Sequence, residues 1–228
     1  EGIMEEKKFV ELRKEEHGLK EFVKRSFGKG KISGVKIEYT PVGEKIIVMT
    51  HKPGLIIGKR GERISELTET LKKRFKMENP HVDIEEIMHP DFDSQLVGDE
   101  IALMIERLGP MRFKSICYRM LGRIKEAGAL GAEIRVSGKL PSDRAKSWRF
   151  AFGYLKKTGD AAKVVYKAES IAETRQGVVG IKVSILSPDK KIHDRIELDE
   201  DKMTEIKKNS VFEEVEEVKK VKKKPRKK

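Results

Sequence analysis

Residues 53–64 are Pro-Gly-Leu-Ile-Ile-Gly-Lys-Arg-Gly-Glu-Arg-Ile, a short apolar run followed by two glycines that bracket two cations. Gly58 and Gly61 have no Cβ, so the backbone can turn sharply there and lie close to another molecule. The first amides of a helix that follows such a turn are free to donate to an anion. Lys59 and Arg60 place positive charge beside those donors. The stretch therefore predicts a clamp for phosphate groups.

The residues on both sides of the clamp favour a strand, an apolar turn and a basic amphipathic helix. Ile46 to Thr50 alternates as a strand does. After the loop, one face of a helix would hold Ile64, Leu67, Leu71 and Phe75, and the rest would hold Arg63, Lys72, Lys73, Arg74 and Lys76. This arrangement resembles a KH module, whose loop clamps about four nucleotides by their backbone. The resemblance implies RNA contact through Gly58, Lys59, Arg60 and Gly61, with Lys52 and Arg63 beside them.

The pattern around the clamp predicts an N-terminal domain over residues 5–88. Its expected elements are a helix over 5–27, strained near His17 and Gly18, strands near 35–39 and 46–50 joined by a turn at 41–43, the basic helix, and a strand at 81–86. The apolar stripe of the first helix includes Phe9 and Leu12. The order helix, strand, strand, helix, strand matches the prokaryotic-type, or type II, KH arrangement.

A second domain is expected over residues 92–187, after a linker at His89-Pro90-Asp91. One helix, capped by Asp93 or Ser94, would turn Val97, Ile101, Met104, Ile105 and Leu108 inward, and the next would bury Phe113, Ile116, Cys117, Met120, Leu121 and Ile124. The period then becomes two, which predicts strands near 134–136, 148–154, 164–174 and 179–185. The fold class is therefore α+β, with two helices covering one face of a four-stranded sheet.

Three groups of residues in this second domain leave two interpretations open. Trp148, Phe150, Phe152 and Tyr154 suit a platform for stacked bases, or, as we favour, the apolar core face that two helices need. The second helix also carries cations that either bind RNA or form a solvated face, at Arg112, Lys114, Arg119, Arg123 and Lys125. The loop after residue 138 carries Lys139, Arg144 and Lys146, which either contact phosphate or are simply exposed to solvent.

The charge of the chain favours a polyanion as partner. The 228 residues include 50 Lys and Arg against 38 Asp and Glu, which gives a net charge of +12 and a pI near 9.5. Without a long apolar segment, nucleic acid is favoured over a membrane. Residues 219–228 hold eight of the cations and no acid. The extension 188–228 is therefore expected to be disordered in isolation and able to bind RNA by counterion release.

The cysteine and histidine content argues against a metal site. Cys117 is the one cysteine, so neither an internal disulfide nor a Cys-based zinc cluster is expected, and its apolar neighbours favour core packing. We expect no catalytic residue, metal, cofactor or small-molecule substrate. The charged N-terminus lacks the pattern of a signal peptide, which favours a cytoplasmic location.

Four separated segments carry a wider resemblance. They are His-Lys-Pro-Gly-Leu-Ile-Ile-Gly-Lys-Arg-Gly-Glu-Arg-Ile at 51–64, Gly-Ala-Leu-Gly-Ala-Glu-Ile-Arg-Val-Ser-Gly-Lys-Leu at 128–140, Arg-Ala-Lys-Ser at 144–147 and Gln-Gly-Val-Val-Gly-Ile-Lys-Val at 176–183. Together they resemble small-subunit ribosomal protein three over residues 5–187. The segment 144–147 is more similar to the archaeal and eukaryotic branch of this universal family than to the bacterial one.

The family resemblance implies a place in the head of the small ribosomal subunit, bound to rRNA and neighbouring ribosomal proteins and lining the pore where mRNA enters. The family uses a pair of cations early in the second C-terminal helix, and one a turn later, to help open mRNA helices. Here the pair is Lys114 and Ser115, and the later position is Tyr118 with Arg119 beside it. No Gly-x-x-x-x-Gly-Lys-Ser/Thr loop is present. We therefore expect passive electrostatic guidance of mRNA.

Two alternative functions are open to test. A free-standing KH regulator would read single-stranded RNA in a hydrophobic groove, to which Ile56, Ile57 and Ile64 would contribute. A lyase acting on damaged DNA would need an activated lysine or a metal held by carboxylates and His. The sequence distinguishes no lysine, and its five His residues are scattered.

Overall fold

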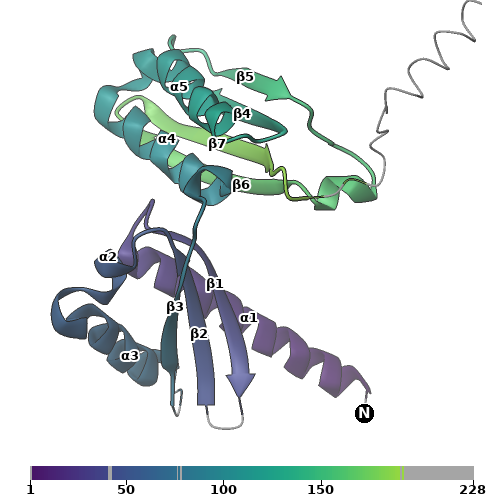
Figure 1. Cartoon of the computed structure of the whole chain (residues 1–228). Coiled ribbons are helices and arrows are strands. Elements are labelled where there is room, and N and C mark those ends of the chain that lie inside the picture. Colours follow the sequence, from purple (N-terminus) through teal and green to yellow (C-terminus); the bar gives the residue numbers. More distant parts are fainter. Residues whose placement is uncertain (1, 41–42, 76, 78, 191, 193–228) are drawn as a thin grey trace, which may run out of the picture. The chain divides into compact units, whose positions relative to one another are not determined.

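The computed structural model of the chain describes residues 2–40, 43–75, 77, 79–190 and 192, which form two sheets, each with its own hydrophobic core (Figure 1). Most of the predicted extension, the centre of the predicted turn at 41–43 and the predicted helix residue Lys76 lie outside the described residues. The expected domain limits, 5–88 and 92–187, stay predictions.

The N-terminal half has the element order that the sequence predicts. It consists of α1 (Gly2–Phe27), β1 (Ile32–Thr40), β2 (Gly43–Thr50), α2 (Pro53–Ile57), α3 (Glu62–Phe75) and β3 (His81–Glu86). The sheet order is β1-β2-β3, with β1 antiparallel and β3 parallel to β2. A parallel pair needs a crossover connection, which α2 and α3 supply. The clamp loop lies within this crossover.

The first helix differs from the prediction in two ways. It is continuous through Gly18, so the expected strain there was wrong. Its later turns bury Leu19 and Val23 in the core, but Phe9 and Leu12 remain 58% and 53% exposed. A helix of 26 residues is about 39 Å long, whereas the nine residues of β1 extend about 30 Å. The helix is therefore longer than the strand against which it packs.

The apolar run before the clamp loop is a short helix, not a simple turn. Pro53 occupies its first turn, where a missing N–H costs nothing. Because this segment is helical, Ile56 points into the core and is fully buried, while Leu55 and Ile57 are 44% and 38% exposed.

The C-terminal half is the predicted sandwich of two helices and four strands. It consists of α4 (Ser94–Leu108), α5 (Phe113–Glu126), β4 (Gly131–Gly138), β5 (Lys146–Gly153), β6 (Tyr166–Thr174) and β7 (Gly177–Leu186). The antiparallel sheet has the order β5-β4-β7-β6. The helices α4 and α5 lie on one face of this sheet (Figure 1). Short 3-10 turns stand before each helix, at Pro90–Phe92 and Pro110–Arg112, and before β6, at Asp160–Lys163.

The predicted core positions are mostly confirmed. Asp93 caps α4, since its carboxylate accepts the N–H groups of Gln95 and Leu96. Cys117 is buried, and burial raises the pKa of its thiol to about 12. Leu108 is an exception, 48% exposed in the last turn of α4.

The aromatic face of β5 belongs to the core, as favoured. Phe150 is buried, and Trp148 and Phe152 pack against the same cluster. The ring of Phe113 on α5 lies 5.5 Å from Trp148 and 6.2 Å from Phe150, centroid to centroid. Tyr154 departs from the pattern with 47% exposure, because β5 ends at Gly153.

Candidate nucleic-acid interface

The clamp loop is a tight turn with left-handed backbone at three residues. The φ angles are +72° at Gly58, +55° at Arg60 and +80° at Gly61. Glycine adopts such angles freely, but a residue with a Cβ is strained there. Among the described residues, Arg60 is the one non-glycine residue with positive φ. The strained conformation turns the chain from α2 into α3 within one 3-10 turn at Lys59–Gly61.

Both cations of the loop are available to a ligand. Lys59 and Arg60 are exposed, and neither makes an ion pair or side-chain hydrogen bond with any residue that the structure describes. Such unpaired charge beside the N-terminus of α3 attracts anions. The loop therefore has the tight turn and the exposed charge that the sequence predicts, and phosphate binding there stays a prediction.

Arg63 differs from Lys59 and Arg60 because its side chain makes a hydrogen bond within the protein. Its Nη1 donates a hydrogen bond of 2.8 Å to the carbonyl oxygen of Leu55, which ties α3 to α2. A Cβ added to Gly58 would lie 2.9 Å from Cγ of Arg63. Arg63 therefore packs against Gly58 and stabilises the turn.

The start of α2 is anchored to the end of β2. The Thr50 hydroxyl is buried and donates to the carbonyl oxygen of Lys31 at 2.6 Å. It also accepts the backbone N–H of Lys52 at 3.1 Å, and the Lys52 side chain is exposed. Sequence reasoning missed Thr50, although a threonine whose hydroxyl bonds the backbone two residues further on is a recognisable turn signal.

The apolar surface beside the clamp is not the one predicted. Ile56 is fully buried and takes no part in a groove, because the helical turn of α2 points it inward. Leu55, which the prediction omitted, is exposed together with Ile57. Ile64 on α3 is half-buried. The apolar side chains near the loop are therefore Leu55, Ile57 and Ile64.

A second group of cations gathers where α5 begins. The ammonium of Lys114 lies 4.6 Å from the ring centroid of Trp148, a cation–π contact. The indole N–H of Trp148 donates to the carbonyl oxygen of Leu140 at 3.3 Å. These two contacts join the start of α5 to the loop before β5. The predicted cations around this junction are exposed and make no ion pair or side-chain hydrogen bond with any described residue, at Arg112, Lys139, Arg144 and Lys146.

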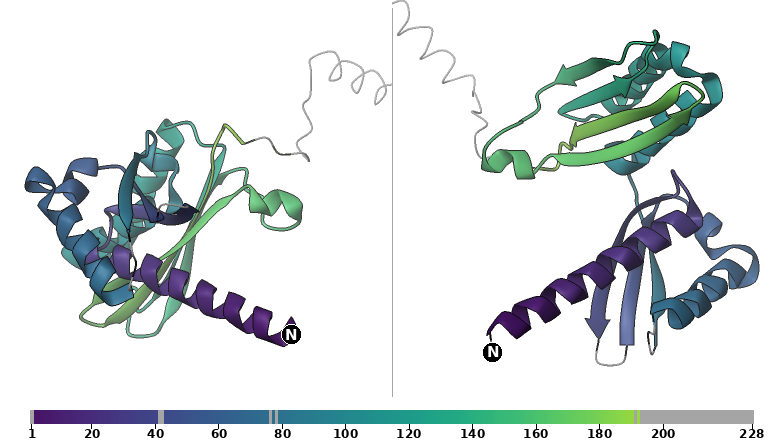
Figure 2. Two further views of the ribbon diagram at one scale, coloured as in Figure 1. Left: turned by 90° about the horizontal axis from the view of Figure 1, so that it is seen from below. Right: turned by 180° about the vertical axis from the view of Figure 1, so that it is seen from behind.

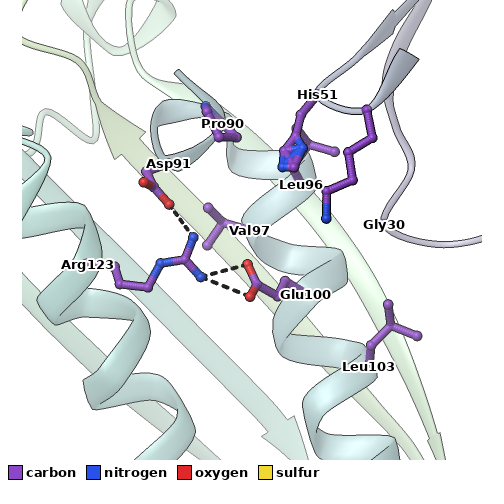
Figure 3. Close-up of a pocket in the computed structure, with 10 residues that line it drawn as sticks. Gly30, His51, Pro90, Asp91, Leu96, Val97, Glu100, Leu103 and Arg123 are labelled. Atoms are coloured by element: carbon purple, nitrogen blue, oxygen red, sulfur yellow. Dashed lines mark hydrogen bonds and ion pairs between the residues drawn. The ribbon is translucent and has the colours of Figure 1, made fainter. Parts of the chain in front are cut away.

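The two arginines later on α5 have different surroundings. Arg119 is exposed and unpaired among the described residues, beside Tyr118, whose ring meets Phe150 edge-on at 5.1 Å. Arg123 is held by two carboxylates. Its Nη2 lies 2.6 Å from Asp91, and its Nη1 donates to both oxygens of Glu100 at 2.9 and 3.0 Å (Figure 3). Of these two arginines, Arg119 is the one without a carboxylate partner among the described residues.

Electrostatics keep Arg123 charged in this arrangement. Partial burial disfavours the guanidinium, but attraction to Glu100 and Asp91 and the hydrogen bonds to both carboxylates outweigh burial and raise its pKa. Within the described residues, no three His, Cys, Asp or Glu side chains are close enough to hold a metal ion. None of the described helices is both long and apolar enough to span a bilayer.

Comparison with known proteins identifies both halves of the chain. The model of the KH domain matches residues 17–92, and that of the C-terminal domain of ribosomal protein S3 matches residues 101–185. Small ribosomal subunit protein uS3 of Methanocaldococcus jannaschii is 39% identical over 87% of this chain and 95% of its own length. That of Archaeoglobus fulgidus is 41% identical over 85% of this chain and 83% of its own. With an RNA-binding KH domain and an S3-type C-terminal domain, this chain belongs to the uS3 family of small ribosomal subunit proteins.

Proposed function

We propose that the protein is a structural constituent of the small-subunit head in the cytoplasmic ribosome, that it binds rRNA, and that it lines the pore where mRNA enters. In this proposal it has no catalytic role, cofactor or small-molecule substrate. The observation that carries the proposal is the pair of exposed, unpaired cations, Lys59 and Arg60, on a turn with left-handed backbone at the start of a helix.

The clamp supplies contact with the backbone of RNA. Phosphate oxygens accept hydrogen bonds from backbone N–H groups at a helix N-terminus, and lysine and arginine add charge. Because the donors are backbone groups, this contact fixes the position of RNA without selecting a sequence.

The cations at the start of α5 supply the path for mRNA. Lys114 and Arg119 project from the helix, and Lys139, Arg144 and Lys146 extend the positive surface along the neighbouring loop. Such a surface holds separated strands by their phosphates, while translocation by the ribosome supplies the work of opening helices. Ser115 and Tyr118 occupy positions that are cationic in the family pattern, so the guidance rests on fewer charges here.

Charge reversal in a strain that depends on the altered protein tests the path. We expect Lys114→Glu with Arg119→Glu to leave subunit assembly largely intact and to slow both mRNA loading and passage through structured mRNA. Lys7→Glu with Lys8→Glu, on the exposed start of α1, makes the same change of charge as a control. The mRNA path is excluded if the two double variants load and translate structured mRNA equally well.

A further inference from the structure

The four-stranded sheet has an outer face that no described helix covers. In the right-hand view of Figure 2 this sheet lies in front of α4 and α5. Alternation along the strands turns Glu133 and Arg135 of β4 outward, with Arg149 of β5 and Lys182 of β7 beside them. None of these four residues belongs to the sites described above.

Glu133 organises the cations on this face. It is only 8% exposed although it lies on the outer face. Its carboxylate is 3.3 Å from Nη2 of Arg135, 3.0 Å from Nη2 of Arg149 and 2.6 Å from Nζ of Lys157. The hydrogen bond from Arg149 and the charges of Arg149 and Lys157, opposed by burial, lower the pKa of Glu133 to about 2. Three cations on one carboxylate leave two positive charges in excess.

The cross-strand register adds to this excess. Arg135 stands directly opposite Arg149 on one side and Lys182 on the other. Lys182 is paired with Glu169, which stands opposite it on β6 at 2.6 Å. Arg135 and Arg149 remain like charges directly opposite each other, an arrangement that destabilises a sheet. A departure from local rules of this kind is expected where a protein binds something.

The same face contains a shallow pocket of about 190 Å³. Its charged lining consists of Glu133 and five cations, Arg135, Lys156, Lys157, Lys167 and Lys182. Sites for drug-sized ligands usually measure roughly 300–1,000 Å³ and are mostly apolar. The pocket is smaller and cationic, which suits a single anionic group.

We propose that the outer face of this sheet binds the phosphate backbone of RNA, with one phosphate in the pocket beside Glu133 and Lys167. This inference rests on the proposed function and adds an RNA contact separate from the clamp and from α5.

The face suits a backbone better than bases. Its central outward positions hold Ser137, Ser184 and Gly180, which are small and let a polymer approach the sheet. The paired outward positions of β4, β5, β6 and β7 include no aromatic residue on which a base would stack. Phosphates that approach the row would neutralise the charge that Glu133 leaves unbalanced.

The test uses the full-length protein and a short fluorescent oligouridylate at about 50 to 200 mM salt. The face variant carries Arg135→Gln, Lys167→Gln and Lys182→Gln. It leaves Arg149 and Lys157 paired with Glu133 and removes the exposed ion pair between Lys182 and Glu169. The control carries Lys7→Gln, Lys8→Gln and Lys14→Gln on exposed positions of α1 and removes the same charge. We expect the face variant to bind about tenfold or more weakly and to lower the salt slope by roughly 2, that is, ~0.7 per phosphate contact. The control should change little.

A clamp variant, Lys59→Gln with Arg60→Gln, separates this inference from the proposed function. Affinity losses that add when face and clamp variants are combined support two independent contacts. If the clamp variant loses affinity and the face variant matches the α1 control, the sheet contact is wrong and the proposed function stands. If neither variant loses affinity, both fail. A face variant that binds RNA normally but does not enter subunits would show that a protein occupies this face, and would also overturn the inference.

Discussion

The ammonium of Lys114 lies 4.6 Å from the ring centroid of Trp148, and this contact joins a helix to the edge strand of the sheet. Trp148 also binds the carbonyl oxygen of Leu140 through its indole N–H. A single half-buried ring therefore sets the position of a cation on α5 and of the loop that holds Lys139, Arg144 and Lys146. The proposed path for mRNA depends on this ring.

Trp148→Phe should separate these two contributions. The phenyl ring keeps most of the packing and part of the cation–π contact but loses the donor to Leu140. We expect the free energy of unfolding in urea to fall by about 1 kcal/mol, whereas Trp148→Ala should cost roughly 2–4 kcal/mol because packing is lost as well. Phe152→Ala serves as a control that leaves the Leu140 contact in place. Equal losses for Trp148→Phe and Trp148→Ala would refute the role assigned to the indole N–H.

The left-handed backbone at Arg60 predicts opposite effects of glycine at two adjacent positions. Arg60→Gly removes the strain of a φ of +55° and should raise the free energy of unfolding by up to ~1 kcal/mol. Lys59→Gly removes the same charge at a residue without positive φ, so it should lower stability by roughly 0.5–1 kcal/mol. Both should weaken RNA binding, and fluorescence anisotropy measures this. Strong RNA binding by Arg60→Gly would show that its charge has no part in the clamp.

Close packing of α4 on β6 predicts a clash that a second substitution relieves. A Cβ at Gly98 would lie 2.7 Å from Oγ of Ser170, and Asp99 holds that hydroxyl at 2.7 Å. Gly98→Ala should therefore cost about 1–3 kcal/mol. With Ser170→Ala already present, the same change should be neutral or stabilising, since alanine favours a helix by about 1 kcal/mol. Urea denaturation of the unaltered protein, the two single variants and the double variant measures the coupling. Additive effects of the two substitutions would contradict the clash.

The sequence predicts the order of elements because apolar periodicity encodes it. The period of two at Val179, Ile181, Val183 and Ile185 predicts a strand with one buried face, and β7 buries all four. The same periodicity fails at Phe9 and Leu12, because a helical stripe does not reveal where the neighbouring sheet ends. The hypothesis of a free-standing KH regulator placed Ile56 in a groove, because the sequence of residues 53–57 does not distinguish a turn from a short helix.

The candidate site could be predicted only in part. Gly58 and Gly61 predict the clamp, because residues without a Cβ are the ones that a tight turn with left-handed backbone requires. Arg119 and Arg123 are alike in the sequence, four residues apart on one helix, yet only Arg123 reaches two carboxylates from other elements. No sequence pattern marks the role of Glu133, because this role depends on strand register and on Lys157, which lies beyond the end of β5.

The low pKa of Glu133 predicts how stability depends on pH. Its pKa of about 2 in the folded chain lies below the ordinary value of 4.5, so its contribution is complete above about pH 5 and is lost as pH falls through 2. The difference between these two pKa values corresponds to at most ~3 kcal/mol of stability. The contribution is smaller than this limit, because the partner cations are half-exposed and solvent screens their charge. Glu133→Gln should flatten the change in unfolding free energy between about pH 5 and 2. The control is Glu169→Gln, an exposed residue on the same face, whose unfolding free energy should vary with pH as that of the unaltered protein does. If the Glu133→Gln curve ran parallel to the curve of the unaltered protein, this account would be contradicted.

Arg119 and Arg123 provide the clearest separation of binding from folding. Arg123→Gln leaves Asp91 and Glu100 without their shared partner, so it should lower the free energy of unfolding by about 1–2 kcal/mol. Its RNA affinity should change little where the protein is fully folded, because this guanidinium is already occupied by two carboxylates. Arg119→Gln removes an exposed, unpaired cation, so stability should stay within about 0.5 kcal/mol while RNA binding weakens. Urea denaturation and anisotropy with the oligouridylate measure both quantities. If Arg123→Gln weakened RNA binding more than Arg119→Gln without loss of stability, Arg123 would contact RNA directly and its pairing with Asp91 and Glu100 would have to open on binding.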